Sequence, residues 1–119
     1  MREKALGADH PDVTLSRQNL AETLLALGQV NEALRQAELA WARRQQDDIP
    51  VEPRATTAFL LARALMASPR SADTQTRAQT LAKQALELYE QAGDQAAGKP
   101  YEASIQEVER WLRAHGSTP

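Results

Sequence analysis

An alanine pattern that occurs twice constrains the fold of this 119-residue chain more than any other feature. Within residues 31–46 and again within 75–93, three alanines are separated by four and then three residues: Ala33, Ala37 and Ala40, then Ala78, Ala82 and Ala85. These spacings place the three residues on one face of an α-helix. Small side chains on one face let a neighbouring helix approach closely, so each segment predicts one member of a helix pair.

The other member of each pair is predicted by the segment that comes before it. Leu20-Ala21 is followed by Leu24, and Leu61-Ala62 is followed by Leu65 at the same spacing. Leu61 follows Leu20 by 41 residues and Ala78 follows Ala33 by 45 residues, which indicates a short insertion in the second copy, at "PRSADT". A helix pair cannot bury both of its apolar faces alone, so the two pairs are expected to stack into a solenoid. In the first helix the buried stripe is expected at Val13, Leu20, Leu24 and Leu27.

Breaks in the periodic pattern divide the chain. Gly28, "DDIPVEP", Gly93 and "DQAAGKP" are typical of helix ends and loops. The last helical segment places Tyr101, Ile105, Val108 and Leu112 on one face and charged residues on the other. We therefore predict an all-α fold, a right-handed α-solenoid of two helix-turn-helix repeats with a capping helix. The predicted units are an end of a preceding repeat or N-terminal extension, two repeats and the capping helix, at residues 1–10, 11–47, 53–92 and 99–115.

The composition argues against several classes of protein. The chain has no cysteine, which excludes disulfides, zinc fingers and thiol nucleophiles. A net charge of -2 and 4% aromatic residues argue against nucleic-acid binding, which uses basic stripes and stacking platforms. No apolar run reaches the roughly 18 residues that a membrane span needs. We predict a cytoplasmic protein that binds neither nucleic acid nor membranes.

The segment "GADHPDV" raises the question of a metal site or a catalytic site. Asp9, His10 and Asp12 surround Pro11, but a metal would need a further ligand, and the other histidine is His115. The same residues suit a helix start, because proline fits the first turn and acidic side chains favour the positive end of the helix dipole. No serine lies in a Gly-x-Ser-x-Gly context, and no glycine loop for phosphate is present. We expect no catalytic residue, no metal and no cofactor, and therefore no enzyme.

Three stretches resemble known repeat families. "NLAETLLALGQVNEALRQAELA" resembles a tetratricopeptide repeat, and "LGADHPDVTLSRQNLAETLLALG" resembles the longer repeats of kinesin light chain. The second repeat departs from this pattern, since it lacks the turn glycine and has Leu60 where the first has Asn19. "EVERWLRAHG" resembles the end of tetratricopeptide regions attached to bacterial serine/threonine kinases, although the chain contains no kinase motif.

The resemblance implies a protein–protein interaction module, a scaffold or regulatory domain whose first helices line a concave groove for a peptide. By similarity to kinesin light chain, Asn19 would hydrogen-bond the peptide backbone. The groove residues are expected to be Leu15, Gln18, Asn19, Glu22, Leu25, Thr56, Phe59, Leu60, Arg63 and Met66. Two alternatives stay open: the last helix could fill the groove, and exposed solenoid ends could join two copies into a homodimer.

Overall fold

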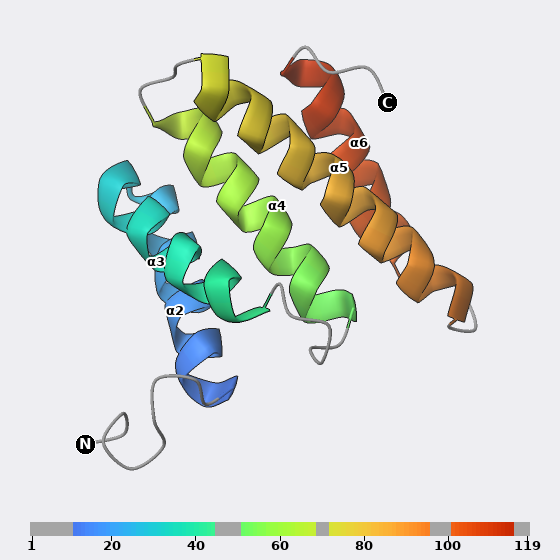
Figure 1. Ribbon diagram of the computed structural model, residues 1–119, viewed down its shortest axis with the longest axis horizontal. Helices are drawn as coiled ribbons and strands as arrows, with labels where there is room; N and C mark the ends of the chain where they lie inside the picture. The colour runs from blue at the N-terminus through green and yellow to red at the C-terminus, as the bar shows by residue number, and fades with distance from the viewer. Residues whose placement is uncertain (1–10, 45–50, 69–71, 96–100, 116–119) are drawn as a thin grey trace.

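The computed structural model describes residues 11–44, 51–68, 72–95 and 101–115. These residues form helices and turns, and the predicted all-α helical repeat fold is confirmed. The helices lie side by side in chain order, so that the first two form one pair and the next two form another (Figure 1). Their bounds are α2 Pro11–Ala26, α3 Val30–Arg44, α4 Val51–Ala67, α5 Ala72–Gln95 and α6 Glu102–Ala114. The unit predicted at residues 1–10 lies outside the described residues.

A glycine makes the tight turn inside the first pair. Gly28 has φ +81°, a left-handed conformation that residues with a Cβ adopt at a cost. The turn places the Gln29 N–H 2.9 Å from the Leu24 carbonyl and the Gly28 N–H 3.1 Å from the Leu25 carbonyl. Two carbonyls at the end of α2 thereby gain donors, as in a glycine C-cap. The cap predicted at Gly28 is present.

Several helix boundaries differ from the sequence prediction. α5 begins at Ala72, inside the segment "PRSADT" that was predicted as an insertion. α4 begins at Val51 and includes Pro53, because an N–H in the first turn has no partner within the helix and its absence is tolerated. α5 runs through Gly93 to Gln95, where the sequence predicted an end. A glycine inside a helix costs only about 1 kcal/mol, which tertiary packing can offset.

The core centres on α4, which packs against α5, α3 and α2. Leu60 and Leu61 have no exposed surface, and most of this helix is buried on several sides. The alanines of both stripes are also fully buried: Ala33, Ala37, Ala40, Ala78, Ala82 and Ala85. The predicted alanine stripes therefore form the contact faces of α3 and α5.

The buried stripe expected on α2 is only partly correct. Val13 is buried, but Leu20 is 46% exposed and Leu27 is 67% exposed. Within the described residues no helix packs on that side of α2, whereas α4 has a preceding pair packed against it. The fully buried Leu61, which occupies the position of Leu20 in the second repeat, illustrates the difference. The periodic pattern therefore identified an apolar side of α2 correctly but not its burial.

A buried polar cluster joins the two pairs instead. Gln18 of α2 accepts a hydrogen bond from the Arg44 guanidinium of α3, which also donates to the Thr57 hydroxyl of α4 at 3.2 Å. Thr57 is fully buried and Gln18 is nearly so. Burial lowers the pKa of Arg44, because desolvation disfavours the charged form. Gln18, which the sequence assigned to the groove, thus holds three helices together.

The exposed and buried leucines at equivalent positions should differ in their contribution to stability. We expect Leu61→Ala to lower the free energy of unfolding by about 2–5 kcal/mol, because it leaves a cavity in the core. Leu20→Ala should cost less than about 1 kcal/mol, since the side chain is half exposed. Urea denaturation followed by circular dichroism measures both. Equal losses would contradict the environments described for these two leucines.

The polar cluster gives a second prediction. Thr57→Val should lower the free energy of unfolding by about 1–3 kcal/mol, because the shape is kept while Arg44 loses an acceptor inside the protein. Thr80→Val, the same change at an exposed position of α5, is the control and should stay within about 0.5 kcal/mol of the unmodified chain. The same denaturation experiment applies, and a Thr57→Val protein as stable as the control would show that the cluster contributes nothing net.

Candidate functional site

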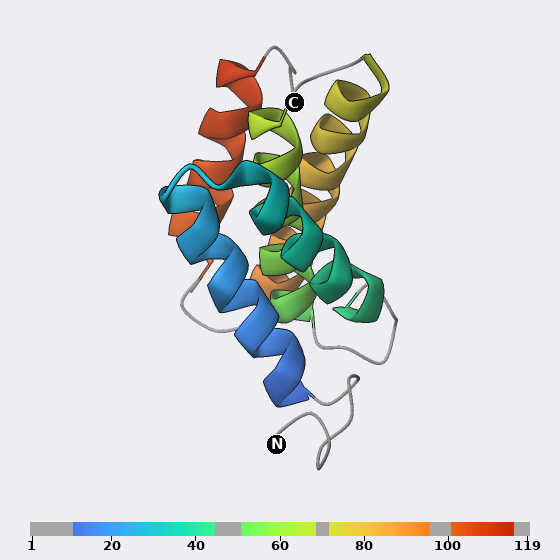
Figure 2. The ribbon, with the colours of Figure 1, turned by 90° about the vertical axis from the view of Figure 1, so that its left-hand side faces the viewer.

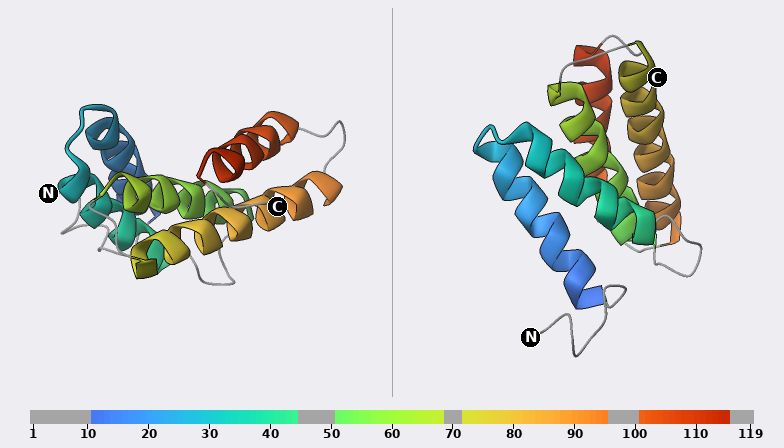
Figure 3. Two further views of the ribbon diagram at one scale, coloured as in Figure 1. Left: turned by 90° about the horizontal axis from the view of Figure 1, so that it is seen from above. Right: turned by 60° about the vertical axis from the view of Figure 1, so that its left-hand side comes forward.

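Three helices line one side of the molecule. Seen from above, α2 and α6 rise on the same side of α4, while α3 and α5 lie on the other side (left panel of Figure 3). α6 packs against α5 and borders this concave side rather than lying between α2 and α4. We call the surface between α2, α4 and α6 the groove. It contains two hollows, one toward each end of α4.

The first hollow, here the apolar hollow, has a volume of about 270 Å³ and receives residues from all three groove helices. Leu25 comes from α2, Met66 from α4 and Trp111 from α6, and Arg63, Ala67 and His115 complete the lining. The Trp111 ring packs edge-on against Phe59, with centroids 5.8 Å apart, and lies 4.4 Å from the His115 ring. The aromatic packing fixes Trp111 at the wall of a site that fits an apolar side chain.

The second hollow, here the polar hollow, has a volume of about 190 Å³ and lies near the start of α4. Its lining comes from three helices: Leu15, Gln18, Arg44, Glu52, Pro53 and Thr56. The Thr56 hydroxyl lies 2.8 Å from the hydroxyl of Tyr89, a residue of α5. Burial raises the pKa of Tyr89, and the Thr56 hydrogen bond opposes that shift. The base of this hollow is therefore held by hydrogen bonds.

An ion pair crosses the groove between the two hollows. A guanidinium nitrogen of Arg63 lies 3.8 Å from a carboxylate oxygen of Glu22, which connects α4 with α2. The guanidinium also lies over the Phe59 ring, 5.2 Å from its centroid. Both charged side chains are about one-third to two-fifths exposed, so the pair contributes no more than about 1 kcal/mol to stability. Such a weak pair leaves both charges available for exchange with a ligand.

The ten residues predicted for the groove occupy different depths. Leu15, Asn19 and Glu22 are exposed, while Leu25, Thr56 and Arg63 are partly buried. Gln18, Phe59, Leu60 and Met66 are buried. Leu15, Gln18 and Thr56 meet at the polar hollow, and Leu25, Arg63 and Met66 meet at the apolar hollow. Phe59 lies beneath Arg63 and Trp111, and Leu60 belongs to the core and offers no surface to a ligand in this conformation.

Sequence reasoning missed six of the residues that line the hollows: Ala67, Trp111, His115, Arg44, Glu52 and Pro53. Trp111 of α6 has its ring against Phe59 of α4. No spacing in the sequence connects residues 59 and 111, because their contact depends on where α6 lies. Arg44 could have been suspected from its place at the end of an amphipathic helix, but its partners lie in two other helices.

The described residues contain no cluster of histidine, aspartate and glutamate suited to a metal ion. Asp9 and His10 lie outside them, and α2 begins at Pro11 as expected for a helix start. None of the helices in the described part of the chain is long and apolar enough to cross a membrane.

Comparison with known proteins supports one family. Residues 13–46 match the model of the tetratricopeptide repeat. No curated protein and no solved structure matches the chain. The matched range holds the described residues of α3 and nearly all of α2, the pair whose turn is formed by Gly28. The match thus supports assigning the α2–α3 pair to the tetratricopeptide repeats, a class that serves protein–protein interaction.

Proposed function

We propose that the chain is a protein-interaction module that binds a peptide segment of a partner protein in the groove between α2, α4 and α6. The observation that carries the proposal is the apolar hollow, where side chains of three helices form one site for an apolar side chain. Preformed hollows of this kind let a peptide dock without reorganising the protein, which lowers the entropic cost of binding. The tetratricopeptide match supports the same class of function.

The groove suggests which groups a peptide would use. A large apolar side chain would enter the apolar hollow against Trp111, Leu25 and Met66. The peptide backbone would pass the exposed Asn19, whose amide can both donate and accept, as the similarity to kinesin light chain implies. Charged groups of the peptide would meet Glu22 and Arg63 at the middle of the groove. Binding would therefore combine one apolar anchor with polar contacts.

The resemblances to two kinds of repeat protein suggest the setting in which such a module would work. A repeat like those of kinesin light chain, or a repeat tail like those of bacterial kinases, would serve as a scaffold or regulatory domain. The residues that line the two hollows include no nucleophile with an adjacent base. The proposed function is therefore binding and involves no catalytic step.

Selection from a phage-displayed library of random peptides tests the proposal on the 119-residue chain. We expect peptides with a large apolar residue. Two exposed substitutions should weaken them by about tenfold, equivalent to 1.4 kcal/mol. Ala67→Phe fills the apolar hollow from the end of α4, and Leu15→Glu adds charge beside Glu52 in the polar hollow. Fluorescence anisotropy of labelled peptides measures the affinities.

The matched control is Leu20→Glu. Leu20 lies on the same helix as Leu15 and is equally exposed, at 46%, but it lines neither hollow of the groove. Selected peptides should bind this variant as they bind the unmodified chain. Phe59→Ala is unsuitable, because Phe59 is buried against Trp111 and its loss would disturb folding. Peptides that bind Ala67→Phe and Leu15→Glu at full strength would refute the groove assignment.

A further inference from the structure

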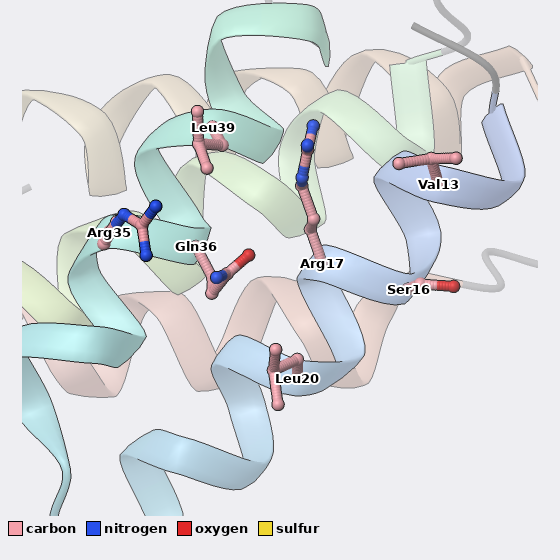
Figure 4. Close-up of a pocket in the computed structure, with 7 residues that line it drawn as sticks. All are labelled: Val13, Ser16, Arg17, Leu20, Arg35, Gln36 and Leu39. Carbon is pink, nitrogen blue, oxygen red and sulfur yellow. The ribbon is translucent and has the colours of Figure 1, made fainter. Parts of the chain in front are cut away.

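A third hollow lies at the end of the molecule that is opposite α6. It has a volume of about 470 Å³ and is formed by α2 and α3 alone. Figure 2 looks onto this end, with α2 and α3 in front of the remaining helices. Figure 4 shows its residues along the two neighbouring helices, and the lining has four residues from α2 and three from α3. We call this surface the end face, and its residues are Val13, Ser16, Arg17, Leu20, Arg35, Gln36 and Leu39.

The internal repeat shows what the same surface looks like when a helix covers it. By the 41-residue offset, Ser16, Arg17 and Leu20 correspond to Thr57, Ala58 and Leu61, all three of which are fully buried. By the 45-residue offset, Gln36 corresponds to Leu81, which is 5% exposed, whereas Arg35 and Leu39 correspond to Thr80 and Gln84, which are exposed, so the covered part of the surface centres on α2 and Gln36. In the first repeat, Ser16 and Leu20 are exposed, and Arg17 and Gln36 are partly exposed. The second repeat differs because the first pair packs against α4.

The helix of the first pair that covers α4 is α3, and most of its buried residues are small. α3 packs on α4, and three of its buried residues are the alanines of its stripe, followed by Trp41. From this equivalence we infer that the end face docks an amphipathic helix of a partner protein, one that carries small residues at the four-then-three spacing. The surface is distinct from the groove, so the chain would have two separate binding sites.

A second copy of this chain is a poor occupant. The alanine stripes of α3 and α5 have no exposed surface, so neither can be offered to another molecule without unfolding its own pair. The helix at the opposite end, α6, exposes Glu102, Gln106, Glu107, Arg110 and Arg113, a polar set that does not complement leucines. Association with a helix of a different protein therefore fits the end face better.

Charge specifies one position of the partner helix. Glu38 of α3 receives two hydrogen bonds from the guanidinium of Arg77 in α5, at 2.6 and 2.8 Å, so this pair fixes one repeat against the next. By the 45-residue offset, the residue of α3 that corresponds to Arg77 is Glu32, which carries the opposite charge and lies next to the end face in the sequence of α3. Glu32 is exposed, and its carboxylate pairs with Arg35 at 3.1 Å and accepts a long hydrogen bond from Gln36, both within α3. The partner helix should therefore carry Lys or Arg where α3 carries Glu38.

Polar residues limit the strength of this contact. Arg17 and Gln36 stand where the second repeat has Ala58 and Leu81. Arg17 already makes an interaction within the chain. The end face is thus an apolar patch around Leu20 and Leu39 with a polar border, the composition of an interface that forms and dissociates.

A helical peptide with the sequence of residues 30–44 and the change Glu38→Arg tests the inference, because α3 covers the equivalent surface of α4. A hydrocarbon staple between positions 35 and 39, both exposed in α3, keeps the peptide helical. We expect saturable binding to the 119-residue chain by fluorescence anisotropy. Leu20→Glu should weaken it by about tenfold or more, whereas Leu15→Glu, at an equally exposed leucine in the groove, should leave it within about twofold.

A charge exchange makes the test specific. The peptide that keeps Glu38 should bind the unmodified chain more weakly than the Glu38→Arg peptide, and the order should reverse for a chain with Glu32→Arg. Full binding to Leu20→Glu would overturn the inference, since the peptide would then be displacing α3 from α4. A chain that sediments as a dimer and becomes monomeric on Leu20→Glu would also overturn it, because a second copy would then cover the end face.

Discussion

Close approach of neighbouring helices is the constraint on which the rest of the structure depends. The contacts between neighbouring helices include alanines that have no exposed surface, such as Ala21 in α2 and Ala82 in α5. A larger side chain at such a position would force the helices apart, at a cost of about 1–3 kcal/mol. The spacing of the alanines thus determines where the helices cross, and the crossings place α2, α4 and α6 along one side.

Stacking makes the burial of each pair depend on its neighbours. α4 lies between the first pair and α5 and is buried almost throughout. α2 contacts α3 and α4, and its opposite side is not covered by another helix of the described residues. The consequence differs between the two ends. At the α6 end the outward side is polar, and at the α2 end Leu20, Leu27 and Leu39 remain exposed. The described part of the chain therefore has a polar end at α6 and an end with exposed leucines at α2.

Features that depend on a single helix could be predicted from the sequence. The alanine stripes, the turn at Gly28 and the division into pairs all follow from spacing and local conformation. Features that depend on a neighbouring pair could not. Gln18 is buried because Arg44 and Thr57 meet it from two other helices, and Phe59 is covered because α6 brings Trp111 over it. The residues predicted for the groove lie on α2 and α4, and which of them line its hollows depends on contacts between residues far apart in the chain.

The two leucines of α2 show why exposure alone does not identify a binding surface. Leu15 and Leu20 are five residues apart, which turns them about 140° from each other around the helix. Both are 46% exposed, and a single exposed leucine is ordinary on a protein surface. What distinguishes them is their surroundings: Leu15 lines the polar hollow of the groove, and Leu20 lines the end face at a position that is fully buried in the second repeat. One helix can thus contribute to two surfaces, because its apolar residues are not confined to the face that it buries, which holds Val13 and Ala21 but not Leu20.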